Sequence, residues 1–125
     1  MKISEAIAEV DNLKPNMYGT KDKIKWLSRL DARIYQEIVQ THERNEGEED
    51  ITFTPYTEND TDKELLVAQP YDEIYVHWLE AQIDYSNMEY DSFNNSNAMF
   101  EAVFAQFRNA HNRCHKPKGE TKIYY

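Results

Sequence analysis

The sequence predicts an all-α fold, a small bundle of about four helices, and three observations lead to this class. Apolar residues recur at spacings of three and four over long stretches, which is the period of one helix face. Strand-like alternation is confined to an island at residues 51–53. A chain of 125 residues, 40% apolar and 13% aromatic, can close one modest core. We therefore expect one helical domain over residues 1–115, followed by an extended C-terminal tail over residues 116–125.

Two helices are expected in the first third of the chain. The first is short, with Ser4 as its candidate N-cap and Pro15 at its end. The second begins after a turn, with Thr20 as its cap, and ends near Thr41. Its apolar positions follow spacings of 3, 3, 4 and 4 and are Ile24, Leu27, Leu30, Ile34 and Ile38. That stripe is typical of a helix that faces a core.

A long acidic loop is expected over residues 42–64, where the helical period stops. Residues 43–64 hold nine acidic and two basic side chains. Residues 51–54 leave room for a short β-hairpin strand. A loop of this length is either disordered or functional, and the sequence leaves both interpretations open.

Two further helices are expected after this loop. The third runs from Tyr71 to Met88, with Pro70 suited to its first turn. Its apolar residues cover most of the circumference and leave one narrow polar stripe, so we expect it at the centre of the fold. The stripe consists of Glu73, His77, Glu80, Asp84 and Asn87. The fourth helix starts at Asp91 or Ser92, and its apolar stripe is Met99, Phe100, Val103, Phe104, Phe107, Ala110 and Cys114.

Two constellations have residue types that could carry chemistry. The polar stripe of the third helix can be interpreted as an acid-base site or as a solvated face, and the solvated face is favoured. His111, Cys114 and His115 have ligand-type side chains, but no general base stands between the histidines, and a buried thiol on the apolar stripe is ordinary. A basic helix end is therefore favoured over a metal site.

No enzyme class has positive support in the sequence. The three glycines stand alone at positions 19, 47 and 119, so no glycine-rich phosphate loop can be built from them. We expect no catalytic residues, no metal and no cofactor.

The charge and hydropathy restrict the partners and the location. The net charge of −9 disfavours a role that depends on holding a phosphate backbone. No run approaches the roughly 20 apolar residues of a membrane span, and the first ten residues lack the pattern of a secretory signal. We expect a soluble protein that acts inside a cell, or in a particle assembled there, without a membrane partner.

The last residues suggest a docking segment. Ile123, Tyr124 and Tyr125 form an apolar, aromatic end, and Lys116, Lys118 and Lys122 precede it. Exposed aromatic residues beside cations suit an apolar groove on a partner. Chance composition is the alternative, because the chain contains nine tyrosines.

The run LLVAQPYDEIYVHWLEAQIDYSNMEYDSFNNSNAMFEAVFAQFRNAHNR resembles a segment of small virion proteins from tailed bacteriophages and prophages of Gram-positive bacteria. The shared pattern is P-Y-D-x-[IV]-Y-x-x-[YW]-L-x-A-Q-I-D-Y, followed by E-Y-x-x-[FY]-N-N and a helix rich in Phe and Ala. The openings ISEAIAEVDNLKPNMY and KIKWLSRLDARI are similar as well, so the resemblance spans most of residues 3–114 without the acidic loop. These proteins are the head-to-tail connectors, or adaptors, of long-tailed phages.

The resemblance implies a mostly helical subunit in a ring of about a dozen copies beneath the portal protein. The C-terminal tail would dock onto the portal, and the loop would contact a downstream head-completion or tail protein. Double-stranded DNA would pass through the ring without specific binding, because a lumen lined by carboxylates repels phosphate. The location would be the head-tail junction of the virion, assembled in the host bacterial cytoplasm.

Particular residues follow from this expectation. The acids best suited to the lumen or to loop contacts are Glu46, Glu48, Glu49 and Asp50. Glu80 and Asp84 can equally face Arg29 or Arg33 of a neighbouring subunit. A different class of function stays open, an acidic phage-encoded inhibitor that mimics DNA and binds a basic host protein.

Overall fold

The fold is all-α, as the sequence predicts, in a computed structural model that describes residues 1–39, 41 and 52–115. Within these residues there are four α-helices and no β-strand. The helices are α1 (Ile3–Leu13), α2 (Thr20–Ile34), α3 (Ile74–Ser86) and α4 (Tyr90–Cys114). A π-helical turn, η1 (Tyr35–Val39), continues α2, and a 3₁₀ turn, η2 (Tyr71–Glu73), leads into α3. No helix of the described residues is both long and apolar enough to cross a membrane.

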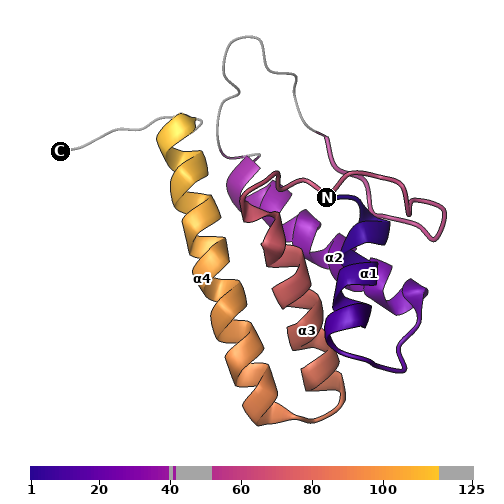
Figure 1. The fold of residues 1–125 in the computed structure, drawn as a ribbon. Helices are drawn as coiled ribbons and strands as arrows, with labels where there is room; N and C mark the ends of the chain where they lie inside the picture. The colour runs from indigo at the N-terminus through magenta and orange to yellow at the C-terminus, as the bar shows by residue number, and fades with distance from the viewer. Residues whose placement is uncertain (40, 42–51, 116–125) are drawn as a thin grey trace.

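Helix α3 lies at the centre, as expected. Figure 1 shows α3 and α4 as an antiparallel hairpin, with α1 and α2 on the other side of α3. The indole nitrogen of Trp78 on α3 donates to the carbonyl of Trp26 on α2, at 2.8 Å, and its ring lies 5.0 Å from that of Phe100 on α4. Trp78 therefore joins the three longest helices of the fold.

The first turn of α1 is held by residues far along the chain. The helix begins at Ile3, so Ser4 lies inside it, and the prediction that Ser4 is the N-cap is wrong. The N–H groups of Ile3 and Ser4 donate to the carbonyls of Lys63 and Thr61, at 3.0 and 2.9 Å. Backbone carbonyls thus satisfy the donors that a capping side chain would otherwise accept.

The connection after α2 is structured in its second half. Residues 42–51 lie outside the described residues, so the structure leaves that half of the predicted acidic loop untested, and Ile51 of the predicted hairpin falls there. Residues 52–54 form no strand. Leu65 and Val67 are buried in the core, and the N–H of Leu65 donates to the carbonyl of Met1 at 3.0 Å. The second half of the connection is therefore part of the domain.

A buried carboxylate fastens this segment to the helices. Asp31 on α2 is fully buried and accepts hydrogen bonds from the Tyr56 hydroxyl, the Tyr75 hydroxyl at 2.6 Å and the N–H of Leu66 at 3.1 Å. The Tyr75 oxygen accepts the N–H of Val67 at 2.8 Å. One carboxylate thus joins α2, α3 and the connection through three donors that carry no charge.

Burial controls the ionisation of this group. Desolvation raises the pKa of Asp31 above its ordinary value of 3.8, and the three hydrogen bonds lower it by less. Burial and the nearby carboxylate raise the pKa of both tyrosines, so they stay protonated as donors at neutral pH.

The apolar stripe of α4 is buried only in its middle. Phe100, Val103 and Phe104 are buried, whereas Met99 is exposed. Cys114 is also exposed, so the expectation of a buried thiol there is wrong. At 25 residues, α4 is much longer than α3 with 13, and the last turns extend past the part of the helix that α3 covers.

We predict that Asp31→Asn makes the free energy of unfolding less dependent on pH. A raised folded-state pKa means that the folded wild-type protein takes up its proton before the unfolded chain does as pH falls. The free energy of unfolding of the wild type should therefore rise relative to that of Asp31→Asn between neutral pH and about pH 4, where the unfolded carboxyl also titrates. Urea unfolding at several pH values measures this difference. Glu101→Gln on the exposed face of α4 is the control, and a difference that stays flat or shrinks toward acid pH would contradict the prediction.

Candidate functional site

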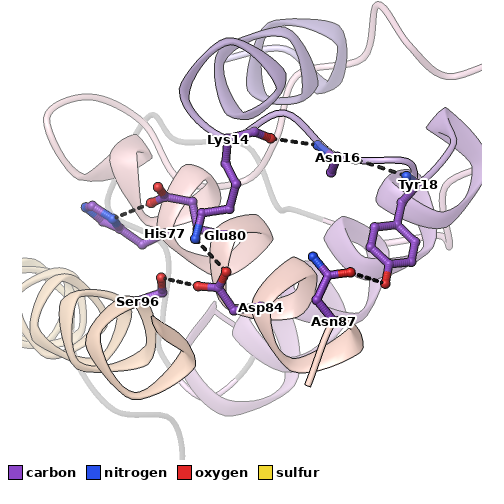
Figure 2. A network of polar contacts seen from close by, with 8 residues as sticks. All are labelled: Lys14, Asn16, Tyr18, His77, Glu80, Asp84, Asn87 and Ser96. Atoms are coloured by element: carbon purple, nitrogen blue, oxygen red, sulfur yellow. Dashed lines mark hydrogen bonds and ion pairs between the residues drawn. The ribbon is translucent and has the colours of Figure 1, made fainter. Parts of the chain in front are cut away.

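The polar stripe of α3 lies in a seam between elements. Asp84 is fully buried, and its two oxygens are held by Lys14 Nζ at 2.5 Å and Ser96 Oγ at 2.9 Å. Figure 2 shows these partners approaching from the chain after α1 and from α4. The interpretation of the stripe as a solvated face is therefore wrong at Asp84, because both neighbouring elements cover it.

The ends of the stripe are more open. His77 lies between two glutamates, with Nε2 3.5 Å from Glu73 and Nδ1 3.3 Å from Glu80. At the other end, the Tyr18 hydroxyl donates to Asn87 Oδ1 at 2.8 Å (Figure 2). Tyr18 and Lys14 belong to the same turn between α1 and α2, so this turn is fastened to α3 at two points.

The contacts along this seam suit a structural role better than a role in acid-base catalysis. The carboxylate with the strongest burial, Asp84, has both oxygens engaged by Lys14 and Ser96. A general acid or base needs a free position toward a substrate. The geometry therefore assigns Asp84 a structural role and makes it inaccessible to an arginine of a neighbouring subunit.

The two arginines expected at a subunit contact lie one turn apart on α2. Arg29 is exposed and borders a groove between α2 and residues 55–58. Arg33 pairs with Glu37 at 3.1 Å, and its guanidinium lies 4.6 Å above the Phe104 ring of α4. Arg29 is open to a partner, whereas Arg33 already has two partners within the chain.

An acidic groove lies beside the first residue. Its carboxylates come from α1, the connection and η2, and are Glu5, Glu9, Glu64 and Asp72. The N-terminal ammonium of Met1 lies 3.8 Å from both Glu64 and Asp72. This ammonium offsets part of the negative charge of the groove.

The histidines at the end of α4 are stacked. The rings of His111 and His115 lie 4.1 Å apart and nearly parallel, at 13°, and the carbonyl of His111 lies 3.1 Å from Nδ1 of His115. Stacked faces do not direct two nitrogens at one ion. Among the described residues, no group of three or more ligand-type side chains could hold a metal.

The remaining predicted site residues lie outside the described residues. These are the loop acids Glu46, Glu48, Glu49 and Asp50, and the tail residues Lys116, Lys118, Lys122, Ile123, Tyr124 and Tyr125.

Sequence reasoning missed two buried charges and one surface. Lys23 is almost fully buried and donates to Asp11 Oδ1 and to the carbonyl of Tyr18, both at 2.7 Å. Lys23 and Asp31 precede and follow Leu27 by four residues, so both lie on the apolar stripe of α2. A charged residue on such a stripe is the signal that indicates a buried partner. The missed surface is a group of exposed apolar side chains at one end of the bundle.

Comparison with known proteins gives no relative. No family model, no curated protein and no solved structure matches the chain.

We predict that Lys14→Met destabilises the protein by about 3 kcal/mol, because Asp84 would keep its buried charge without its cation. Adding Asp84→Leu should recover most of the loss, since an apolar pair avoids the desolvation of both charges. Urea unfolding of the two variants measures both effects. Lys25→Met on the exposed face of α2 is the control. A double variant no more stable than Lys14→Met would contradict this account.

Proposed function

We propose that the protein is a structural subunit of a tailed-phage particle, a head-to-tail connector that assembles as a ring between the portal protein and the tail. One observation carries the proposal. The run over residues 65–113 that resembles virion proteins contains η2, α3 and α4, and these elements form the centre of the fold. The resemblance therefore involves the residues that build the core, in addition to surface positions.

The burial of residues in the shared pattern supports the proposal of a shared fold. Within the shared pattern, Ile74, Tyr75 and Leu79 lie in the core, and Pro70 precedes the turn that starts α3. Residues buried in a core contribute to packing, so a resemblance at these positions supports a shared fold more directly than a shared ligand. The connector role is the function that we attach to that fold.

The distribution of charge supports passage of DNA without binding. Nine acidic side chains are concentrated in residues 43–64, and one of them, Glu64, lines the acidic groove beside Met1 with carboxylates from α1 and η2. In the proposed ring, acidic surfaces face the channel and repel the phosphate backbone. Exposed basic residues such as Arg29 then contact protein neighbours.

We predict that the protein co-purifies with the portal protein encoded in its own genome and adds a ring to the portal in negative-stain images. Association that survives moderate salt would support the connector. No association at either low or moderate salt would overturn it and favour the acidic inhibitor, which should instead retain a basic host protein.

Deletion of residues 116–125 should abolish docking onto the particle and leave the helical content unchanged. The reason is that the described core closes without these residues. Circular dichroism and co-sedimentation with portal particles measure the two properties. A loss of helicity on deletion would place the tail in the core and contradict its role as a docking segment.

A further inference from the structure

One end of the bundle exposes an unusual group of large apolar side chains. Between 55% and 88% of each is exposed, and they are Leu13, Met17, Tyr85, Met88 and Tyr90. We call this group the end patch. Among the described residues, the one further exposed large apolar side chain is Met99, at 53%. Large apolar side chains gathered in exposed positions at one end of a molecule often mark an interaction site.

The end patch lies on two turns that are connected by polar contacts. One turn joins α1 to α2 and the other joins α3 to α4, and both lie at the same end of the bundle (Figure 1). The hydrogen bond between Tyr18 and Asn87 and the ion pair between Lys14 and Asp84 connect them (Figure 2). The side chains of the end patch are therefore presented on a fixed base.

A shallow depression completes the end patch. A cavity of about 440 Å³ opens there, and its lining is Met88, Glu89, Tyr90, Asp91 and Ser92. The ring of Tyr85 lies beside it, 6.0 Å from Tyr90 and 5.4 Å from Phe93. The site thus combines an aromatic wall with two exposed carboxylates, Glu89 and Asp91.

We propose that the end patch binds residues 122–125 of a second copy of this chain. This segment reads Lys-Ile-Tyr-Tyr. Its three apolar residues match the aromatic and methionine surface, and its lysine matches Glu89 and Asp91. Aromatic side chains each bury a large area, which suits a short segment that must bind through few residues.

The length of the chain prevents the same copy from placing the whole segment on its own end patch. The end patch lies at the first residues of α4, and residue 116 follows the other end of that helix. The 25 residues of α4 span about 37 Å. Ile123 is eight residues beyond His115, so it can reach at most about 29 Å, and Tyr125 at most about 36 Å. Ile123 therefore falls short of its own end patch by about 8 Å, and only Tyr125 approaches it when the chain is fully extended. The whole segment can occupy the end patch of a neighbour placed end to end but not its own.

Such a contact joins the tail segment of one copy to the end patch of another. Each pair of copies therefore keeps one unoccupied end patch and one unbound tail segment. Contacts of this kind build rings or filaments. The inference goes beyond the proposed function, because it concerns self-association of this chain whether or not a portal is present. It also gives the segment a receptor other than the portal, so that loss of particle docking on deletion would follow from loss of the ring.

Sedimentation velocity of the full chain tests the contact. We expect the average mass of the wild type to rise with concentration above that of one chain. The patch variant, Met17→Ser with Met88→Asn, should remain monomeric, and asparagine suits position 88 because Met88 has a positive φ of 61°. The tail variant, in which Ile123, Tyr124 and Tyr125 are each replaced by Ser, should also remain monomeric. Met99→Ser, which removes an exposed methionine outside the end patch, should behave as the wild type.

A mixture of the patch variant and the tail variant gives a sharper test. The patch variant keeps an intact tail and the tail variant keeps an intact end patch, so a mixture can make one contact per pair. The mixture should form dimers and no larger species, although each variant alone is monomeric. A monomeric wild type, a mixture without dimers, or loss of association with Met99→Ser would overturn the proposal.

The same variants separate this inference from the connector function. Co-purification with the portal tests the connector directly, whereas sedimentation uses the protein alone. Self-association without portal binding would support the inference and contradict the connector. A tail variant that stays associated and loses only portal binding would overturn the inference and support the connector.

Discussion

Burial of α3 on nearly every side is the constraint on which the rest of the structure depends. A buried polar group must have a partner, because water cannot supply one. The Tyr75 hydroxyl donates to Asp31, and Asp31 also accepts the N–H of Leu66 in the connection. Asp84 accepts hydrogen bonds from Lys14, in the turn after α1, and from Ser96 on α4. The polar groups of the central helix therefore decide where its neighbours are fastened.

The helices could be predicted from the sequence because each has an apolar stripe that packing confirms. Leu27, Leu30 and Ile34 recur at helical spacing and are buried. The role of Asp84 could not be predicted in this way, because a carboxylate on a polar stripe has the same pattern whether water or Lys14 covers it. Only the position of a residue 70 places earlier in the chain separates the two cases. Capping of α1 by residues 61–63 was missed for the same reason, because periodicity reports on local contacts.

Acidic, basic and apolar side chains are unevenly distributed over the surface, which the net charge alone does not show. Acidic side chains are concentrated in the connection and beside Met1, whereas α2 carries several exposed basic side chains, among them Arg29 beside a groove. Apart from Met99, the exposed large apolar side chains of the described residues lie in the end patch. A subunit with separate acidic, basic and apolar surfaces suits an assembly in which each neighbour meets a different one. The proposed connector has three classes of neighbour, namely DNA, other subunits and partner proteins.

The contacts between α1 and residues 61–65 also determine the order in which the chain can fold. Helices α3 and α4 adjoin in the sequence, and their pairing closes only the short turn between them. Helix α1 is short, and the donors of its first turn have no acceptors until a segment about sixty residues away has returned to it. The hairpin should therefore form early and α1 late, because contacts between distant residues cost more loop entropy. Amide protons of α1 should accordingly exchange with solvent faster than those in the middle of α3, which makes the N-terminal helix the part of the domain that opens first.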